Sequence, residues 1–280
     1  MNSGPSSTAL TAAAARAAHA LVDAEPHIFT DPLAVTVLGD RAEELLAYHK
    51  VSGAHPVLRG ARTQVVVRSH YTERRLAQAG AGQYVVLGAG LDTFAYRSHL
   101  SVRVFEVDHP ATQAWKRACL DAAGISAAVC YVAVDLETGS LLDALRRTGF
   151  DPKAPTFVSW LGVTMYLSAD ALANNLSALA QLAEDTQLVA DYMVPPQLRD
   201  EAGNAYADAV APIAAQGGEP WLSSFTPEDM AGLLARHGFG VLEDVGQHHA
   251  IDNTLWRRTD GLAPSTLSRL VHATLTSTPR

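Results

Sequence analysis

The chain has 280 residues, of which 48% are hydrophobic and 18% charged, a balance typical of a folded α/β enzyme and not of a disordered protein. Its formal net charge of −8, with arginines gathered only in isolated pairs, argues against nucleic acid as a partner. Two cysteines, no export leader and no long apolar run predict a cytoplasmic protein without disulfides or a membrane span.

The first predicted element is an N-terminal helix over residues 8–22. The stretch TALTAAAARAAHALV has high helix propensity, and Ser or Thr precedes it as a cap. A second helix over 65–78 leads toward the first predicted strand. Residues 1–80 are therefore expected to form a helical cap within a single domain that spans 1–280.

Five short apolar runs follow, each about as long as a strand that is buried on both faces. They cover residues 83–88, 102–107, 128–134, 156–162 and 187–194. Helical segments at about 92–99, 110–123, 140–148 and 169–184 separate or follow them. The repeated order of strand and helix predicts a parallel sheet with helices on both faces and right-handed crossovers. Residues 81–195 are thus the predicted ligand-binding core.

Beyond Pro195 and Pro196 the pattern changes. An alanine-rich helical stretch (197–215) and the loop QGGEPW form a candidate lid over residues 196–221. The next helix has Thr226 as its cap and Pro227 at its first position, and Gly238 lies just past its end. A closing strand over 239–245 follows, so residues 222–280 supply a helix and closing strands. The pair His248 and His249 lacks other ligands at metal-binding spacing, and we predict no metal.

The segment LGAGLD directly after the first strand is the main functional signal. Gly88 and Gly90 allow positive φ and close approach of the backbone to a ligand, and the helix that opens near Asp92 contributes a partly positive end. Doubly wound sheets bind ligands at the carboxyl ends of their strands. Asp108 ends the next strand, about 20 residues after the turn, with Glu106 two positions before it. Such acids accept hydrogen bonds from ribose, which predicts a nucleoside-bearing ligand.

Two kinds of nucleoside ligand compete for this turn. A nicotinamide dinucleotide calls for a third glycine where Thr93 stands, and the charge of Asp92 would repel its diphosphate. S-adenosylmethionine carries a sulfonium, an ammonium and a ribose but no phosphate. The residues therefore favour S-adenosylmethionine, although a bare G-x-G can also be only a turn.

Several segments, in this order, resemble the leucine carboxyl methyltransferase family between about residues 10 and 260. They include RSHYTERRLAQ, QYVVLGAGLDTFAYR, VFEVDHPATQAWK, FVSWLGVTMYLS and GEPWLSSFTPEDM. The chain looks most like the bacterial branch of class I S-adenosylmethionine-dependent O-methyltransferases. This resemblance implies a Rossmann-like, seven-stranded, mostly parallel sheet with helices on both faces, an antiparallel pair at its end and an added helical lid. It also implies methyl transfer to a carboxylate or hydroxyl of a small molecule, in bacterial secondary metabolism.

The resemblance also implies contacts with the cofactor. Arg68 matches the arginine that grips the cofactor's carboxylate, a task that suits a two-pronged donor. Leu161 stands where many relatives have a glutamate, so only its backbone carbonyl is expected to serve. The other expected contacts lie under the methionyl group (Gly88, Ala89, Gly90), at the ribose (Glu106, Asp108) and beside adenine (Asp135, Leu136). The charge of Asp92 itself suits a cofactor that carries a cation. Arg68 can also be a solvated helix arginine, and Asp108 and Asp135 can be helix caps.

Methyl transfer from a sulfonium needs alignment and exclusion of water. A carboxylate acceptor needs no base, whereas a phenol profits from one. We predict that Tyr192 and His70 orient or deprotonate the acceptor, with Tyr166 as a third candidate, although Tyr192 can equally fill the core. The departures at Leu161, His70 and Arg74 keep an alternative open. It is a protein that binds S-adenosylmethionine without transferring the methyl group, as a sensor, a structural partner or a rearrangement enzyme.

Overall fold

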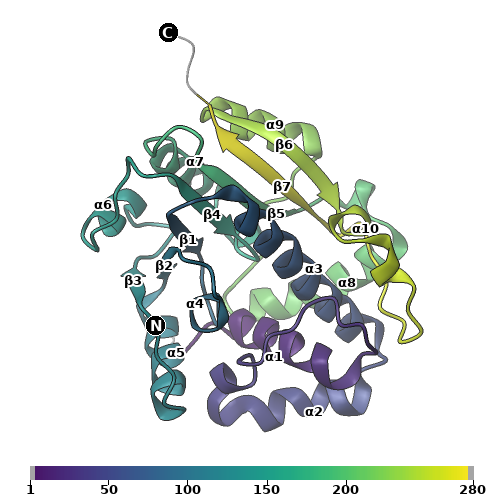
Figure 1. The fold of residues 1–280 in the computed structure, drawn as a ribbon. Coiled ribbons are helices and arrows are strands. Elements are labelled where there is room, and N and C mark those ends of the chain that lie inside the picture. The colour runs from purple at the N-terminus through teal and green to yellow at the C-terminus, as the bar shows by residue number, and fades with distance from the viewer. Residues whose placement is uncertain (1–3, 277–280) are drawn as a thin grey trace.

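A seven-stranded sheet forms the centre of the computed structural model, which describes residues 4–276 (Figure 1). Its strand order is β3-β2-β1-β4-β5-β7-β6. Strands β1 to β5 are parallel, and β7 runs antiparallel to both β5 and β6. The strands are β1 Gln83–Leu87, β2 Arg103–Asp108, β3 Val129–Ala133, β4 Thr156–Trp160, β5 Gln187–Met193, β6 Phe239–Gly246 and β7 Ser268–Leu275. The order reverses between β1 and β4, which is where such sheets bind ligands.

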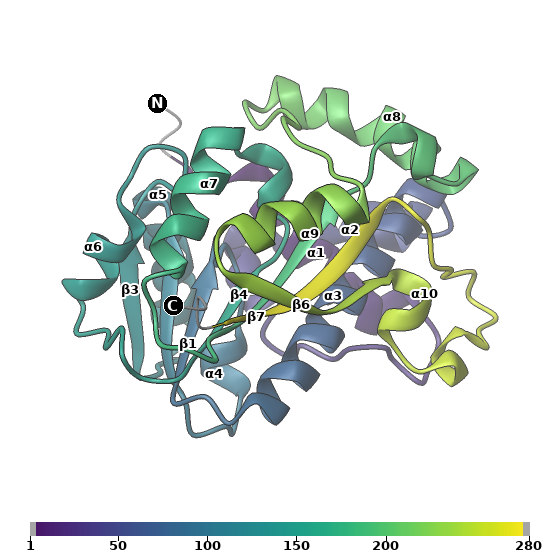
Figure 2. The ribbon, with the colours of Figure 1, turned by 90° about the horizontal axis from the view of Figure 1, so that it is seen from above.

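Helices cover both faces of this sheet. Helices α6 (Leu141–Arg146), α7 (Ala169–Leu179) and α9 (Pro227–Arg236) bury one face, and α9 lies beside β6 (Figure 2). The other face is covered by α1 (Ser7–Val22), α3 (Pro56–Ala79), α4 (Phe94–Arg97) and α10 (Gln247–Ala250). Both faces of strands β1 and β4 are consequently buried, which explains why apolar residues predominate in both strands.

Further helical elements complete the fold. They are α2 (Ala42–Ser52), α5 (Pro110–Ala122), α8 (Glu201–Gln216) and the 3-10 turns η1 (Thr36–Arg41), η2 (Thr164–Tyr166), η3 (Pro196–Leu198) and η4 (Asn253–Trp256). Helix α5 packs on η1, and α8 packs on α3. Within residues 4–276, no helix combines the length and apolarity that crossing a bilayer requires.

The predicted strands and helix caps are confirmed. Each of the six predicted strands is present, with ends shifted by at most two residues. Ser6 caps α1 by accepting a hydrogen bond from the amide of Ala9 at 3.1 Å. Helix α9 begins with a capping box between Thr226 and Asp229, and Gly238 beyond its end has a φ of 80°. Strand β7 and helix α2 are among the elements that the local residue pattern did not locate.

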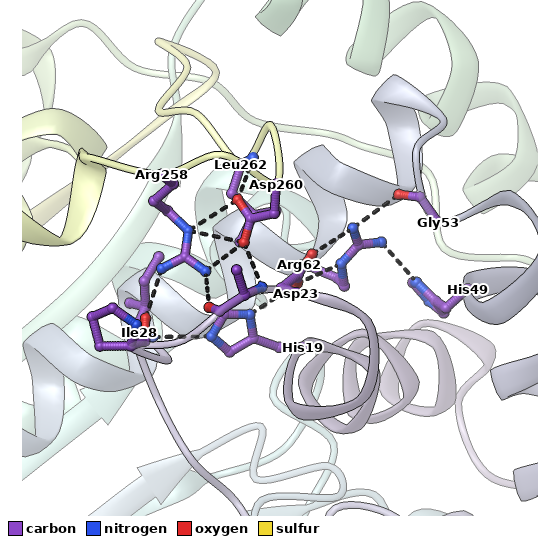
Figure 3. A network of polar contacts seen from close by, with 11 residues as sticks. His19, Asp23, Ile28, His49, Gly53, Arg62, Arg258, Asp260 and Leu262 are labelled. Atoms are coloured by element: carbon purple, nitrogen blue, oxygen red, sulfur yellow. Dashed lines mark hydrogen bonds and ion pairs between the residues drawn. The ribbon is translucent and has the colours of Figure 1, made fainter.

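A buried polar network joins α1 to α3 (Figure 3). The Arg62 guanidinium donates two hydrogen bonds of 2.8 Å to the Asp23 carboxylate and one of 2.9 Å to the Gly53 carbonyl. His19 Nε2 accepts the amide of Ile28 at 3.0 Å, so Nδ1 carries the proton and donates to Asp23 at 2.9 Å. The network therefore fixes the chain at both ends of the segment that follows α1.

The same network reaches the C-terminal part of the chain (Figure 3). Arg258 donates hydrogen bonds to the carbonyls of Ala24 at 2.5 Å and Pro26 at 2.7 Å, and it pairs with Asp260 at 2.5 Å. Asp260 in turn accepts the amide of Ala24 at 2.8 Å. The loop after η4 is thus tied to the segment after α1 across more than 230 positions of sequence.

The network also predicts a pH dependence of stability. Burial, together with the nearby Arg62 charge, lowers the pKa of His49 from its ordinary 6.5 to about 4. The folded protein then binds fewer protons than the unfolded chain, so the stabilisation is complete above pH 6.5 and is lost as the pH falls toward 4. From this group we expect a loss of about 1–2 kcal/mol in the free energy of unfolding between pH 6.5 and 4.5.

Urea unfolding at a series of pH values measures this loss. His49→Gln offers Arg62 an uncharged acceptor and should show a shallower decline than the wild type. The exposed His248 provides the control, because His248→Gln should keep the wild-type slope. Identical slopes for all three proteins would contradict the expectation.

Candidate active site

The glycine turn after β1 has the conformation that its sequence predicts. Gly88 and Gly90 have φ values of 64° and 49°. A Cβ on Gly88 would lie 2.2 Å from Cγ2 of Val163, and one on Gly90 would lie 3.3 Å from Cβ of Ala9. Both positions therefore require glycine, because the turn lies between the residues after β4 and the start of α1.

A buried hydrogen-bond network stabilises the residues that directly follow this turn. The Asp31 carboxylate accepts hydrogen bonds from Arg16 Nε at 2.6 Å and from Thr93 Oγ1 at 2.7 Å. Arg16 also donates to the carbonyl of Leu91 at 2.6 Å. Thr93, at the place of the third glycine of the dinucleotide pattern, thus has a structural task that glycine could not perform. Asp31 was not among the predicted site residues. Its signal in the sequence is a single acid between the apolar residues Ile28, Phe29 and Leu33.

The predicted ribose acid lies directly beside the turn. Asp108, at the end of β2, accepts the amide of Gly90 at 2.5 Å and the amide of His109 at 2.6 Å. Burial raises the pKa of Asp108, and these two amides only partly offset the effect. The amide of Val134 donates to the Asp108 carbonyl at 3.1 Å, which brings the end of β3 next to this acid.

The residues predicted beside adenine follow β3. Asp135 is exposed and accepts the amide of Glu137 at 2.8 Å and the hydroxyl of Thr138 at 3.2 Å. Leu136 is buried against the core. Asp135 therefore closes a turn and caps no helix, because α6 begins only at Leu141 after its N-cap Ser140. It also lies at the same edge of the sheet as Asp108. Its contact with adenine stays a prediction.

The second wall of the site comes from α3, β4 and β5. Arg68 Nη1 donates to Asp191 Oδ2 at 3.2 Å, and the amide of Gly162 donates to Asp191 Oδ1 at 2.6 Å. Gly162 has a φ of 70°, and a Cβ there would lie 2.6 Å from Arg68 Nη2. No other hydrogen bond joins this guanidinium to residues 4–276, so Nε and Nη2 are available to a ligand. Arg68 is held at the strand ends and is not a solvated helix arginine.

The structure contradicts a ribose contact for Glu106. Its side chain is buried, and its carboxylate pairs with the equally buried Lys116 at 2.6 Å. The Tyr96 ring covers the Lys116 ammonium. Glu106 shares a strand face with Asp108 but lies two residues below the edge of the sheet, where a ligand does not reach.

Catalytic roles for Tyr192 and His70 are also contradicted. Tyr192 is fully buried in the core, donates to Asp244 Oδ2 at 2.7 Å, and has a pKa raised by burial. Adjacent strand residues face opposite sides, so Tyr192 lies on the side of the sheet opposite Asp191. His70 Nδ1 donates to the carbonyl of Ile28 at 2.8 Å. It follows Arg68 by two positions, which places it on another face of α3.

Three further predicted contacts have local structural tasks. Asp92 accepts the amide of Phe94 at 2.7 Å and so starts α4. Ala89 is buried, and its amide donates to the carbonyl of Val107 at 3.0 Å. Leu161 packs against the apolar residues between α3 and the sheet. Asp92 and Leu161 remain partly exposed, so their contacts with a ligand stay predictions.

A sequence model of leucine carboxyl methyltransferases matches residues 9–180 of the chain. The chain belongs to this family. Over 217 residues it is 32% identical to YktD of Bacillus subtilis strain 168, named as a candidate S-adenosyl-L-methionine-dependent methyltransferase, with 74% of this chain and 71% of YktD covered.

Solved structures agree with this membership at the level of the fold. A DUF574 family protein from Streptomyces avermitilis has a TM-score of 0.60 at 18% identity, covering 93% of this chain and 96% of that one. A candidate methyltransferase from Thermobifida fusca has a TM-score of 0.55 at 19% identity, covering 99% and 97%. The protein is thus a class I S-adenosylmethionine-dependent methyltransferase, and the predicted fold and cofactor are confirmed.

Part of the predicted lid is the loop of residues 217–226 after α8, called the lid loop below. In the methyltransferase this loop contacts elements on two sides of the glycine turn. Glu219, in the loop after α8, accepts the Ser6 hydroxyl at 2.6 Å and the amide of Thr8 at 3.3 Å. The amide of Leu222 donates to the carbonyl of Met165 at 2.6 Å. The lid loop is therefore attached both to the start of α1 and to η2, on two sides of the turn.

Aromatic and sulfur-containing side chains of the methyltransferase pack together next to the lid loop. Met165 and Met193 are buried there and pack with the partly buried Tyr166, Tyr206 and Trp221. The indole nitrogen of Trp221 is buried and faces the side chain of Tyr166. This cluster, named the aromatic cluster below, is contributed by η2, β5, α8 and the lid loop.

Proposed function

We propose that this methyltransferase transfers the methyl group to an oxygen of a small molecule in bacterial secondary metabolism, and that a carboxylate is the preferred acceptor. The observation that carries the preference is the chemistry of the aromatic cluster. Burial raises the pKa of Tyr166, and it raises the pKa of Tyr206 to about 12. Tyr192 and His70 do not face the cluster, and its two phenols stay protonated at neutral pH, so neither phenol can act as a base. A carboxylate acceptor needs no base, which is why it is preferred.

The edge of the sheet fits the cofactor on this proposal. The free edge of the Arg68 guanidinium would hold its carboxylate, and the backbone at Gly88 and Gly90 would pass beneath its methionyl group. Asp108 would accept from the ribose, and Leu136 would lie beside adenine. When bound, S-adenosylmethionine supplies a methyl group on a sulfonium, which is already a good leaving group.

The aromatic cluster would hold the acceptor. Tyr166, Tyr206 and Trp221 offer flat apolar surfaces on which a small molecule can pack. The lid loop, fastened through Glu219, would keep water out. Alignment and exclusion of water are the main contributions that such a displacement needs.

The pH dependence of turnover tests the choice of acceptor. With S-adenosylmethionine and a panel of aromatic carboxylic acids and phenols, we expect S-adenosylhomocysteine to form with a carboxylic acid at a rate that is flat between about pH 6 and 9. A phenol acceptor without a base should instead show a rate that rises about tenfold per pH unit below its pKa near 10.

Each outcome of this experiment has a defined meaning. Transfer only to phenols, with the rising profile, would overturn the carboxylate preference but keep O-methylation. Transfer only to nitrogen or carbon acceptors, offered in a second panel, would overturn O-methylation. Tight binding of S-adenosylhomocysteine without transfer to any acceptor would support the alternative of a binding protein.

A further inference from the structure

Asp191 is a buried acid at the point where the second wall of the site comes together. It lies in β5, and only 2% of its surface is exposed. One carboxylate oxygen accepts from Arg68 Nη1 at 3.2 Å and the other accepts the amide of Gly162 at 2.6 Å. Its backbone carbonyl accepts the hydroxyl of Thr164 at 2.6 Å. Helix α3 and the turn after β4 thus meet on one residue of β5.

Burying the Asp191 carboxylate costs free energy unless hydrogen bonds and a positive charge compensate it. A carboxylate out of water is tolerated in a protein only where charge and hydrogen bonds compensate it. Asp191 receives one cationic donor and one amide, and so each of its oxygens is occupied. The Arg68 guanidinium lies so close to the Cα of Gly162 that a side chain there would collide with it. The position of Arg68 is therefore set by Asp191 on one side and by Gly162 on another.

We infer that Asp191 is a positioning residue for the amino-acid end of the cofactor. By holding Arg68 through Nη1 alone, it leaves Nε and Nη2 for the cofactor's carboxylate, and by holding the Gly162 amide it fixes the turn after β4. A guanidinium can serve both partners because its donors point in separate fixed directions. The inference rests on the cofactor site of the proposed function and adds a residue to it.

Two ligands separate the amino-acid end from the nucleoside end. S-adenosylhomocysteine has both, whereas 5′-methylthioadenosine keeps the nucleoside and the sulfur but lacks the amino-acid end. For Asp191→Asn, calorimetry should show affinity for S-adenosylhomocysteine reduced about tenfold or more, with affinity for 5′-methylthioadenosine within about twofold of wild type. A merely structural role would lower both affinities together.

Asp244→Asn is the matched control. Asp244 also holds an arginine and a tyrosine of the sheet, Arg269 at 2.6 Å and Tyr192 at 2.7 Å, but it lies on β6 and away from the glycine turn. This variant should bind both ligands as the wild type does. Wild-type affinity for S-adenosylhomocysteine in Asp191→Asn, or an equal loss for both ligands, would overturn the inference. A wild-type protein that binds neither ligand would instead overturn the proposed cofactor site.

A second variant covers the case in which Asp191→Asn does not fold. Gly162→Ala leaves the carboxylate in place but sets a methyl group 2.6 Å from Arg68 Nη2, which forces the guanidinium to move. The same selective loss for S-adenosylhomocysteine is expected. Full affinity for S-adenosylhomocysteine in a folded Gly162→Ala protein would show that the position of Arg68 is not important, and the inference would fail.

Discussion

Arg68→Lys is expected to weaken binding of S-adenosylhomocysteine by about 2–3 kcal/mol, roughly 30- to 150-fold. Lysine keeps the positive charge, but one ammonium cannot pair with Asp191 and with the cofactor's carboxylate in the two directions that the guanidinium serves. Calorimetry with S-adenosylhomocysteine measures the loss. Binding of 5′-methylthioadenosine should be unchanged, because that ligand has no carboxylate.

Arg74→Lys is the control for this experiment. Arg74 is exposed on the same helix and should tolerate the change. Arg75 is less suitable, because its guanidinium pairs with Glu243 and lies 5.0 Å from the centre of the Tyr71 ring. Near-wild-type affinity in both Arg68→Lys and Arg74→Lys would reject the carboxylate role. A loss confined to position 68, with the melting temperature of the free protein retained, would support it.

The parts of the fold that sequence could predict are those that local pattern determines. Strands β1 to β5 are short apolar runs between helical segments, and each was located within two residues. Strand β7 was not located because Arg269 and His272 interrupt its apolar pattern. Its place depends on pairing with β5 on one side and with β6 on the other, and such long-range pairing leaves little trace in a local window.

The site divides in the same way. Gly88, Gly90 and Asp108 follow from the order of strand, turn and strand, and the structure brings them together. The predicted catalytic roles of Tyr192 and His70 were wrong because their side chains face away from Asp191 and Arg68. Tyr192 neighbours Asp191 on one strand, and the sequence could not tell which of the two faces the site.

The directions in which side chains leave a helix or a strand provide two further signals in the sequence. Positions two apart on a helix do not share a face, so Arg68 and His70 could not both have contacted one ligand. An acid inside the apolar run QLVADYMV was likewise a signal for Asp191, because a buried carboxylate needs a partner. Its pairing with Arg68, 123 positions away, could come only from the fold.

The largest effect on stability is expected at Arg62. Arg62→Met keeps most of the apolar volume but leaves the buried Asp23 carboxylate with His19 as its only remaining side-chain partner among residues 4–276. Burial raises the pKa of Asp23, but hydrogen bonds from His19 and Arg62 more than offset this, so the net pKa is lowered. Without Arg62 that compensation is largely lost. We expect the free energy of unfolding to fall by about 3–5 kcal/mol, measured by urea denaturation at pH 7.

The cost should come mainly from the uncompensated charge and less from the lost packing. Asp23→Asn combined with Arg62→Met removes both charges, and it should be more stable than Arg62→Met alone. Arg41→Met is the control for loss of an arginine, since Arg41 pairs with Glu44 at 2.8 Å in an exposed position and its loss should leave the free energy of unfolding close to that of the wild type. If Arg62→Met cost as little as Arg41→Met, the network of Figure 3 would not stabilise the fold, and the link between α1, α3 and the loop after η4 would be a consequence of folding and not one of its causes.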